Sequence, residues 1–132
     1  MSNETSVVTA QPLPRLLGIE VVEASKTKVR GRMSVSADIC TSGHILHGGA
    51  IMAFADTLGA TGAFLNLPEN AGTTTIESKT NFISPAREGT IVEAESVPLH
   101  VGRRSSVWQT RISRADGTLV AIVTQTQLVL QR

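Results

Sequence analysis

The chain has few aromatic residues: one Trp, three Phe and no Tyr among 132 residues. Side chains on which nucleotide bases could stack are therefore scarce, and a formal net charge of +1 offers no broad attraction for a polyanion. We expect no nucleic-acid partner. A composition of 41% hydrophobic and 17% charged residues is that of a folded globular protein, whose core must come mainly from aliphatic residues.

The chain also has little cysteine, and its first residues lack the pattern of a secretory signal. The single cysteine, Cys40, excludes an internal disulfide, and three scattered histidines do not have the spacing of zinc ligands. The first twenty residues carry neither a basic stretch nor an apolar run, so we expect a cytoplasmic protein. A length of 132 residues suits a single domain, 1–132, and we expect residues 1–12, which are polar and patternless, to be flexible.

The most informative segment runs from Gly48 to Pro68 and contains one charged side chain, Asp56. It has the length of a helix that Pro68 ends, and apolar residues on nearly every face, as in a buried helix. A membrane span is the alternative, but a central aspartate costs roughly 2.5–3.5 kcal/mol on insertion scales, so we expect no membrane. A buried carboxylate is tolerated where it is compensated or used, which makes Asp56 the first candidate functional residue.

Strand signals lie on both sides of this helix. The predicted strands cover residues 19–23, 29–37, 73–83, 90–100, 104–114 and 118–130, after a short helix or extended arm near residues 12–18. The Asp116-Gly117 pair predicts a hairpin, and we expect the last four strands to form a meander. One helix cannot cover both faces of a flat sheet. We therefore predict an α+β fold in which a curved six-stranded antiparallel sheet wraps around one long central helix, with a second subunit covering the rest of the helix.

Several motifs together resemble the hotdog-fold acyl-CoA thioesterases, in particular the subgroup of phenylacetyl-CoA thioesterase and the proofreading thioesterase of enterobactin synthesis. The strongest is Leu46-His47-Gly48-Gly49, followed by an acid, Asp56, seven residues after the second glycine. The segments SPAREG at 84–89 and PLHVGR at 98–103 support the likeness, which covers roughly residues 12–130.

The resemblance implies hydrolysis of acyl- or aroyl-thioesters of CoA or of a carrier protein. It implies no metal or cofactor, with CoA entering as part of the substrate. It also implies active sites between the subunits of a homodimer, and dimers that pair into a homotetramer. Asp56 matches the acid that serves as nucleophile or as base for water, and Gly48 matches the glycine whose N–H polarises the thioester carbonyl.

The residues themselves suit these roles. A helix N-terminus presents unpaired N–H groups where an oxyanion can develop, and Gly48 and Gly49 let a ligand approach the backbone closely. Asp56 lies about two turns further on, which makes a reaction within one subunit awkward. We expect His47 to hold the loop by hydrogen bonding rather than to act as a base.

Two adjacent arginines, Arg103 and Arg104, are candidate substrate-binding residues, because guanidinium groups at a hairpin end can bind the phosphates of CoA. A cysteine nucleophile at Cys40 is disfavoured, since no third group that would orient it is evident.

The sequence departs from the family pattern near the expected site. Six residues before the histidine, members usually carry an Asn or Gln that orients the carboxylate or the water, but Thr41 stands there in this chain, and His44 replaces a common glycine. Members with a Glu acid have Ser or Thr where Ala60 stands, whereas members with Asp can use a hydroxyl on the following strand, matched by Thr75. We expect Thr75 to support Asp56 and Thr41 to line the substrate site. Two alternatives stay open: a non-catalytic acyl-CoA-binding domain and a hotdog acyl-CoA hydratase.

Overall fold

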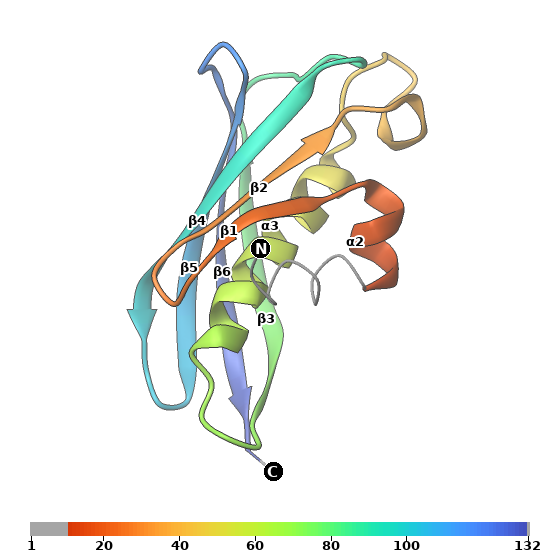
Figure 1. The fold of residues 1–132 in the computed structure, drawn as a ribbon. Helices are drawn as coiled ribbons and strands as arrows, with labels where there is room; N and C mark the ends of the chain where they lie inside the picture. The colour runs from red at the N-terminus through yellow and green to blue at the C-terminus, as the bar shows by residue number, and fades with distance from the viewer. Residues whose placement is uncertain (1–10, 132) are drawn as a thin grey trace.

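The computed structural model describes residues 11–131 and contains one short and one long α-helix together with an antiparallel sheet (Figure 1). In chain order the elements are α2 (Pro12–Leu17), β1 (Glu20–Ala24), β2 (Val29–Ser34), a 3₁₀ turn (Ala37–Ile39), α3 (Gly48–Leu65), β3 (Gly72–Phe82), β4 (Ile91–Val101), β5 (Ser105–Arg114) and β6 (Leu119–Leu130). The expected lead-in segment is a helix, which ends at Gly18 in the left-handed region at φ 76°. The predicted flexibility of residues 1–12 concerns mostly residues outside the described part.

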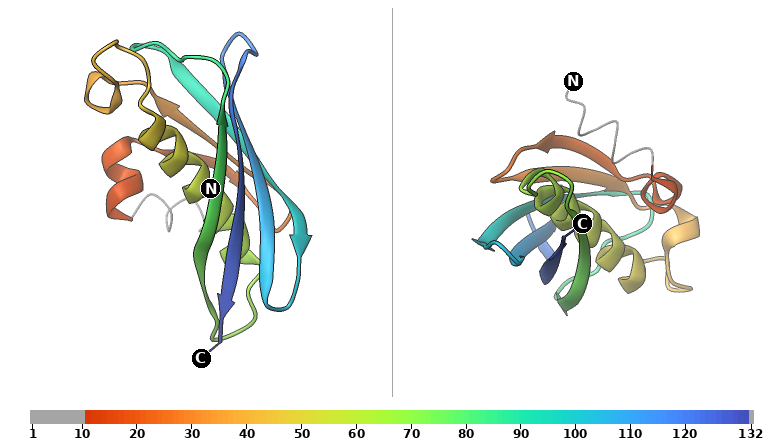
Figure 2. Two further views of the ribbon diagram at one scale, coloured as in Figure 1. Left: turned by 180° about the vertical axis from the view of Figure 1, so that it is seen from behind. Right: turned by 90° about the horizontal axis from the view of Figure 1, so that it is seen from below.

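The six strands form one sheet in the order β1-β2-β4-β5-β6-β3, curved around α3 (Figures 1 and 2). The predicted fold class is thereby confirmed. All neighbouring strands run antiparallel, and the β5–β6 hairpin turns at Gly117, where φ is 89°. The second strand ends at Ser34 rather than at Ala37, because Ala37 begins the 3₁₀ turn.

The prediction that the last four strands form a meander is wrong for β3. This strand pairs with β6 at the edge of the sheet, whereas β4 lies between β2 and β5. The connection after β3 bonds to the loop before α3, where the Leu46 N–H donates to the Ala86 carbonyl. Further on, the Val35 N–H donates to the Thr90 carbonyl, which brings the chain beside β2. The connection therefore crosses the end of the sheet.

Helix α3 packs on the concave face of the sheet, with Phe54 and Leu58 fully buried. Its small residues permit the close approach that their number predicts: a Cβ added at Gly62 would lie 2.4 Å from the ring of Trp108. By length and mean hydropathy, 1.2, α3 could cross a membrane, but half of it is buried inside the fold, as in the core helix of such a sheet. On the opposite side, among residues 11–131, α2 covers only part of the helix, and Met52 and Phe64 are exposed.

Candidate active site

The carboxylate of Asp56 lies between α3 and the edge of the sheet formed by β3 and β6, and is half-buried. The Thr75 hydroxyl donates a hydrogen bond of 2.6 Å to Asp56 Oδ1. Gln125 Nε2 donates to the same oxygen at 3.1 Å. Within residues 11–131, Oδ2 accepts no hydrogen bond. One carboxylate oxygen is thus anchored by two donors, while the other has no hydrogen-bond partner in this part of the chain.

Two buried glutamines of β6 complete this arrangement. Gln127 Nε2 donates to the Thr75 hydroxyl oxygen, and the Thr73 hydroxyl donates to Gln127 Oε1 at 3.0 Å. Gln125 and Gln127 are both fully inaccessible to solvent. The sequence analysis missed them, although the alternation along 118–130 holds the signal: after Ala121 and Val123, the inward-facing positions become polar. A buried polar side chain needs hydrogen-bond partners, and these two glutamines find them in Asp56, Thr75 and Thr73.

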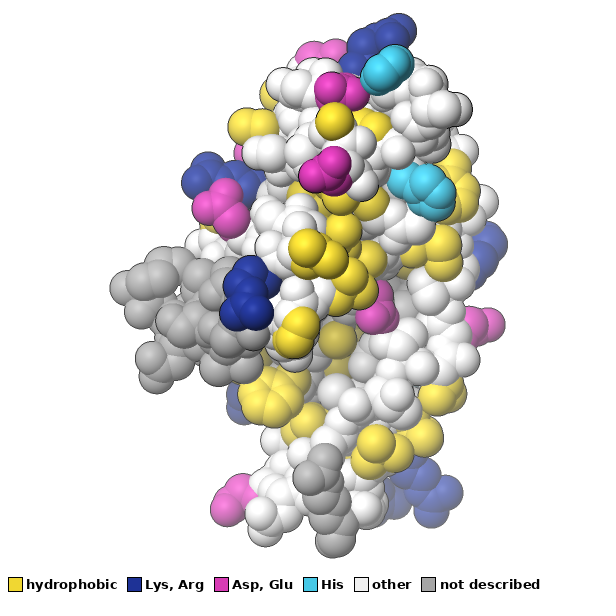
Figure 3. Space-filling view, turned by 90° about the vertical axis from the view of Figure 1, so that its right-hand side faces the viewer, with side chains coloured by type: hydrophobic (Ala, Val, Ile, Leu, Met, Phe, Trp, Pro, Cys, Tyr) yellow, Lys and Arg dark blue, Asp and Glu magenta, His cyan; other side chains and the backbone are white. Residues whose placement is uncertain are grey.

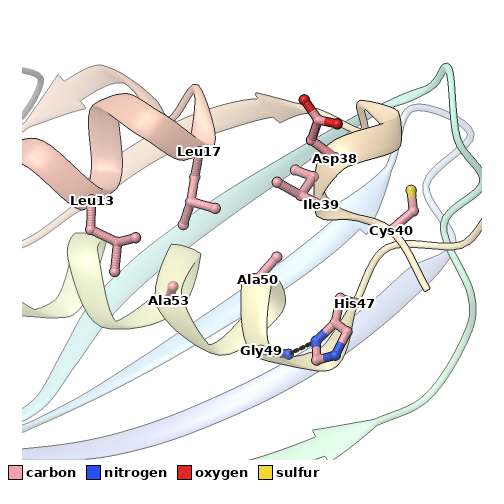
Figure 4. Close-up of a pocket in the computed structure, with 9 residues that line it drawn as sticks. All are labelled: Leu13, Leu17, Asp38, Ile39, Cys40, His47, Gly49, Ala50 and Ala53. Carbon is pink, nitrogen blue, oxygen red and sulfur yellow. Dashed lines mark hydrogen bonds between the residues drawn. The ribbon is translucent and has the colours of Figure 1, made fainter.

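The His-Gly-Gly turn forms the start of α3. His47 is the N-cap, and its Nδ1 accepts a hydrogen bond of 2.8 Å from the Gly49 N–H (Figure 4). An Nδ1 that accepts leaves the proton of the neutral ring on Nε2. The Gly48 N–H, by contrast, has no acceptor in the part of the chain that is described. A helix N-terminus with one free N–H can donate to an oxyanion.

The two glycines face different hollows. Gly48 borders a mostly apolar pocket of about 540 Å³, lined by Thr41, Ile45, Leu46, Gly48, Ile51, Phe82, Ile83, Ser84 and Pro85. Gly49 and His47 border a second pocket of about 310 Å³ beneath α2, whose other lining residues are Leu13, Leu17, Asp38, Ile39, Cys40, Ala50 and Ala53 (Figure 4). Thr41 therefore lies beside Gly48, and its hydroxyl accepts from the Gly43 N–H at 3.2 Å.

Not all candidate residues are brought together within one chain. Gly48 and Asp56 are eight residues apart in α3, which at about 1.5 Å per residue separates them by roughly 12 Å along the helix axis. Arg103 and Arg104 lie in the β4–β5 turn, at the opposite end of the fold from the start of α3 (Figure 1). A site that uses all four residues therefore needs more than one subunit.

Two further sequence observations have a structural explanation. His44 has φ 61°, in the left-handed region that favours glycine, and its Nδ1 lies 3.0 Å from Glu88 Oε1. Burial, followed by the nearby Glu88, raises the pKa of the Cys40 thiol, which opposes thiolate formation and a cysteine nucleophile. Among residues 11–131, no three His, Cys, Asp or Glu side chains are grouped so that they could hold a metal ion.

A curved six-stranded sheet around one long helix is the hotdog fold. The model of the thioesterase superfamily matches residues 43–121, from the loop before His47 to the start of β6. The chain therefore belongs to the thioesterase superfamily, as the motifs predict, and it is a thioesterase.

Individual relatives agree with this assignment. The chain is 34% identical to 1,4-dihydroxy-2-naphthoyl-CoA thioesterase 2 of Arabidopsis thaliana, over 82% of this chain and 68% of that protein. It is 32% identical to the proofreading thioesterase EntH of Klebsiella pneumoniae, over 70% of this chain and 67% of that one. A thioesterase crystal structure from Haemophilus influenzae matches with a TM-score of 0.89 and 26% identity, covering 98% and 89% of the two chains. The hydratase and the non-catalytic domain thereby lose their support.

Proposed function

We propose that the protein hydrolyses acyl- or aroyl-CoA to the free acid and CoA, at sites formed between two subunits. Asp56 acts as nucleophile or as general base, and the Gly48 N–H donates to the developing oxyanion. The observation that carries this proposal is the carboxylate itself: Oδ1 of Asp56 accepts from Thr75 and Gln125, and Oδ2 is left open. A carboxylate held in this way is pre-oriented for attack.

The chemistry needs only the groups already described. In the base mechanism, Asp56 takes a proton from water as the water oxygen bonds to the thioester carbon, and the carbonyl oxygen becomes an oxyanion facing Gly48. The C–S bond then breaks, and the CoA thiolate takes up the proton. In the nucleophile mechanism, Oδ2 bonds to the thioester carbon, the C–S bond breaks, and the CoA thiolate leaves a mixed anhydride on Asp56. Water then opens the anhydride, which releases the acid, restores the Asp56 carboxylate and supplies the proton that the thiolate takes up. Both routes use the same free oxygen and the same N–H donor, and neither uses a metal or a cofactor.

Exposed apolar residues support a homodimer. Strand β3 is an edge strand, and it exposes Ile76 and Phe82 by 57% and 56%. Hydrophobic side chains gather on this side of the molecule (Figure 3). A two-fold axis near Met52, midway between residues 48 and 56 in α3, would place Asp56 of one subunit opposite Gly48 of the other. Pairing of such dimers into a homotetramer belongs to the same proposal.

The same symmetry bears on the substrate. An antiparallel arrangement of two subunits brings the β4–β5 turn of one towards the start of α3 in the other, where Arg103 and Arg104 would bind CoA phosphates. The pocket beside Gly48, with Thr41 at its rim, has a volume of about 540 Å³ and mostly apolar walls. That volume suits an aromatic acyl group. The Arabidopsis relative, named for 1,4-dihydroxy-2-naphthoyl-CoA, favours the same class of substrate.

Thiol release from benzoyl-, phenylacetyl-, 1,4-dihydroxy-2-naphthoyl-, hexanoyl- and decanoyl-CoA tests this proposal. We expect wild type to release CoA, and Asp56→Asn to lower kcat by roughly 10²–10⁴, the usual contribution of a positioned acid or base. Glu69→Gln, an exposed acid in the loop after α3, is the matched control and should keep full activity. An active Asp56→Asn enzyme would refute the role of Asp56. Folded wild type that releases no CoA from any of the five would refute CoA thioesters as substrates.

A further inference from the structure

The hydrogen bonds behind Asp56 all run in one direction. The Thr73 hydroxyl donates to Gln127 Oε1, Gln127 Nε2 donates to Thr75 Oγ1, and the Thr75 hydroxyl donates to Asp56 Oδ1. An amide nitrogen can only donate, so the contact from Gln127 obliges the Thr75 oxygen to accept. The proton of Thr75 is then available for Asp56. Gln127 thus determines which way the Thr75 hydroxyl points.

The burial of these amides indicates that they do more than fill space. Gln125 and Gln127 are fully buried, and transferring an amide out of water is unfavourable unless hydrogen bonds compensate. Gln125 retains a buried Oε1 without a hydrogen-bond partner in the described residues. The helix accommodates it with Gly59, where an added Cβ would lie 2.2 Å from that oxygen. If Gln125 and Gln127 served only to pack the core, apolar side chains would suit these two positions better.

We propose that Gln125 and Gln127 are positioning residues, Gln125 acting directly on Asp56 and Gln127 acting through Thr75. Their hydrogen bonds occupy Asp56 Oδ1 and so leave Oδ2 to face the thioester. This inference rests on the proposed function of Asp56. It assigns to β6 the orienting role for which the resemblance expects Asn or Gln at position 41. Thr41 itself is engaged locally, since its hydroxyl accepts from the Gly43 N–H.

A double-mutant cycle distinguishes this role from a purely structural one. Thr75→Val should lower kcat by roughly ten- to a hundredfold, the range of a hydrogen bond to a charged group, with KM nearly unchanged. Gln127→Met should lower kcat about five- to tenfold in the wild-type background. In the Thr75→Val background it should have no further effect, because Gln127 acts only through the hydroxyl. Gln125→Met, in contrast, should lower kcat in both backgrounds.

Controls cover folding and the neighbouring positions. Thr75→Ser keeps the hydroxyl and should retain kcat within about threefold. Thr126→Val removes a hydroxyl that bonds Glu77 and lies between the two glutamines in sequence, on the other face of β6, and should leave kcat unchanged. Thr75→Val strands a buried amide, so adding Gln127→Met should not lower Tm further. If Thr75→Val does not fold, Thr75→Ser and the two single glutamine variants still test the proposal by their kcat.

The outcomes separate the two proposals. Equal losses from Gln127→Met with and without the Thr75 hydroxyl, or a wild-type kcat for Gln127→Met, would overturn the role of Gln127 while Asp56→Asn stays inactive. A Gln125→Met enzyme with wild-type kcat would overturn the role of Gln125. If Asp56→Asn is itself active, the proposed function has failed, and the positioning role fails with it.

Discussion

Replacing Gly48 by proline should remove the proposed oxyanion donor and leave the helix in place. Gly48 is the first residue of α3, and its N–H has no acceptor within residues 11–131. Proline is favoured at this position, because the N–H that it lacks is not used by the helix. His47, the preceding residue, has φ −67° and ψ 139°, in the extended region that a following proline requires. The backbone is therefore already compatible with the change.

The size of the effect follows from this geometry. Removing one backbone or side-chain donor from an oxyanion hole typically lowers kcat by about 10²–10³. Gly48→Ala is the matched control, because it adds a Cβ and keeps the N–H. That Cβ would lie 3.2 Å from a ring carbon of Phe82, so the ring must shift by a few tenths of an ångström. We therefore expect Gly48→Ala to lose less than about tenfold, a smaller effect than deletion of the donor.

Steady-state release of CoA, measured for both variants beside wild type, tests the prediction. Thermal unfolding followed by circular dichroism should give a Tm for Gly48→Pro close to that of wild type, since proline at an unstrained site restricts the unfolded chain. A Gly48→Pro enzyme that works within about fivefold of Gly48→Ala would show that the Gly48 N–H is not the donor. A large loss of Tm in Gly48→Pro would instead contradict the assignment of Gly48 to the first turn of α3.

Two more expectations concern the subunit interface and the core. Equal amounts of the Asp56→Asn and Gly48→Pro proteins, unfolded together and refolded, should recover up to about a quarter of wild-type activity. Half of the randomly paired dimers are mixed, and one of the two sites in each mixed dimer carries neither substitution. No recovery, in a sample that forms mixed dimers by native mass spectrometry, would contradict a site shared between subunits. Gly62→Ala gains about 1 kcal/mol in helix propensity, but its Cβ would lie 2.4 Å from the Trp108 ring, so we expect net destabilisation of about 1–2 kcal/mol in urea unfolding. A more stable variant would contradict this close packing.

Local patterns predict the elements of this fold well, because each strand and the helix carry their own periodicity. The lateral order of the strands has no such local signal. A tight turn at Asp116-Gly117 obliges β5 and β6 to pair, and that pair is correctly predicted. No comparable turn joins β3 to β4, whose connection spans residues 83–90, so adjacency in sequence did not predict adjacency in space.

The site residues that are close in sequence could likewise be predicted, whereas a contact between distant residues could not. The free N–H of Gly48 and the cap at His47 follow from one short turn, and the residues of that turn are sufficient to suggest them. The resemblance implies a contact between Asp56 and Thr75, and the structure contains that hydrogen bond. Gln125 reaches Asp56 across 69 residues, a separation at which no motif spacing applies. Only its polarity at an inward-facing position could have pointed to it.

The glycines inside α3 explain how the site and the core share one helix. Glycine in a helix interior is less favourable than alanine by about 1 kcal/mol, so Gly59 and Gly62 together destabilise the isolated helix by roughly 2 kcal/mol. At Gly62 the lost propensity is exchanged for packing against Trp108, which stabilises the core. At Gly59 the space is filled by the amide of Gln125, whose Oε1 lacks a partner in the described residues and which contributes little to a hydrophobic core. In that position Gln125 donates a hydrogen bond to Asp56. The glycine at position 59 is therefore better explained by orientation of the carboxylate than by stability of the fold.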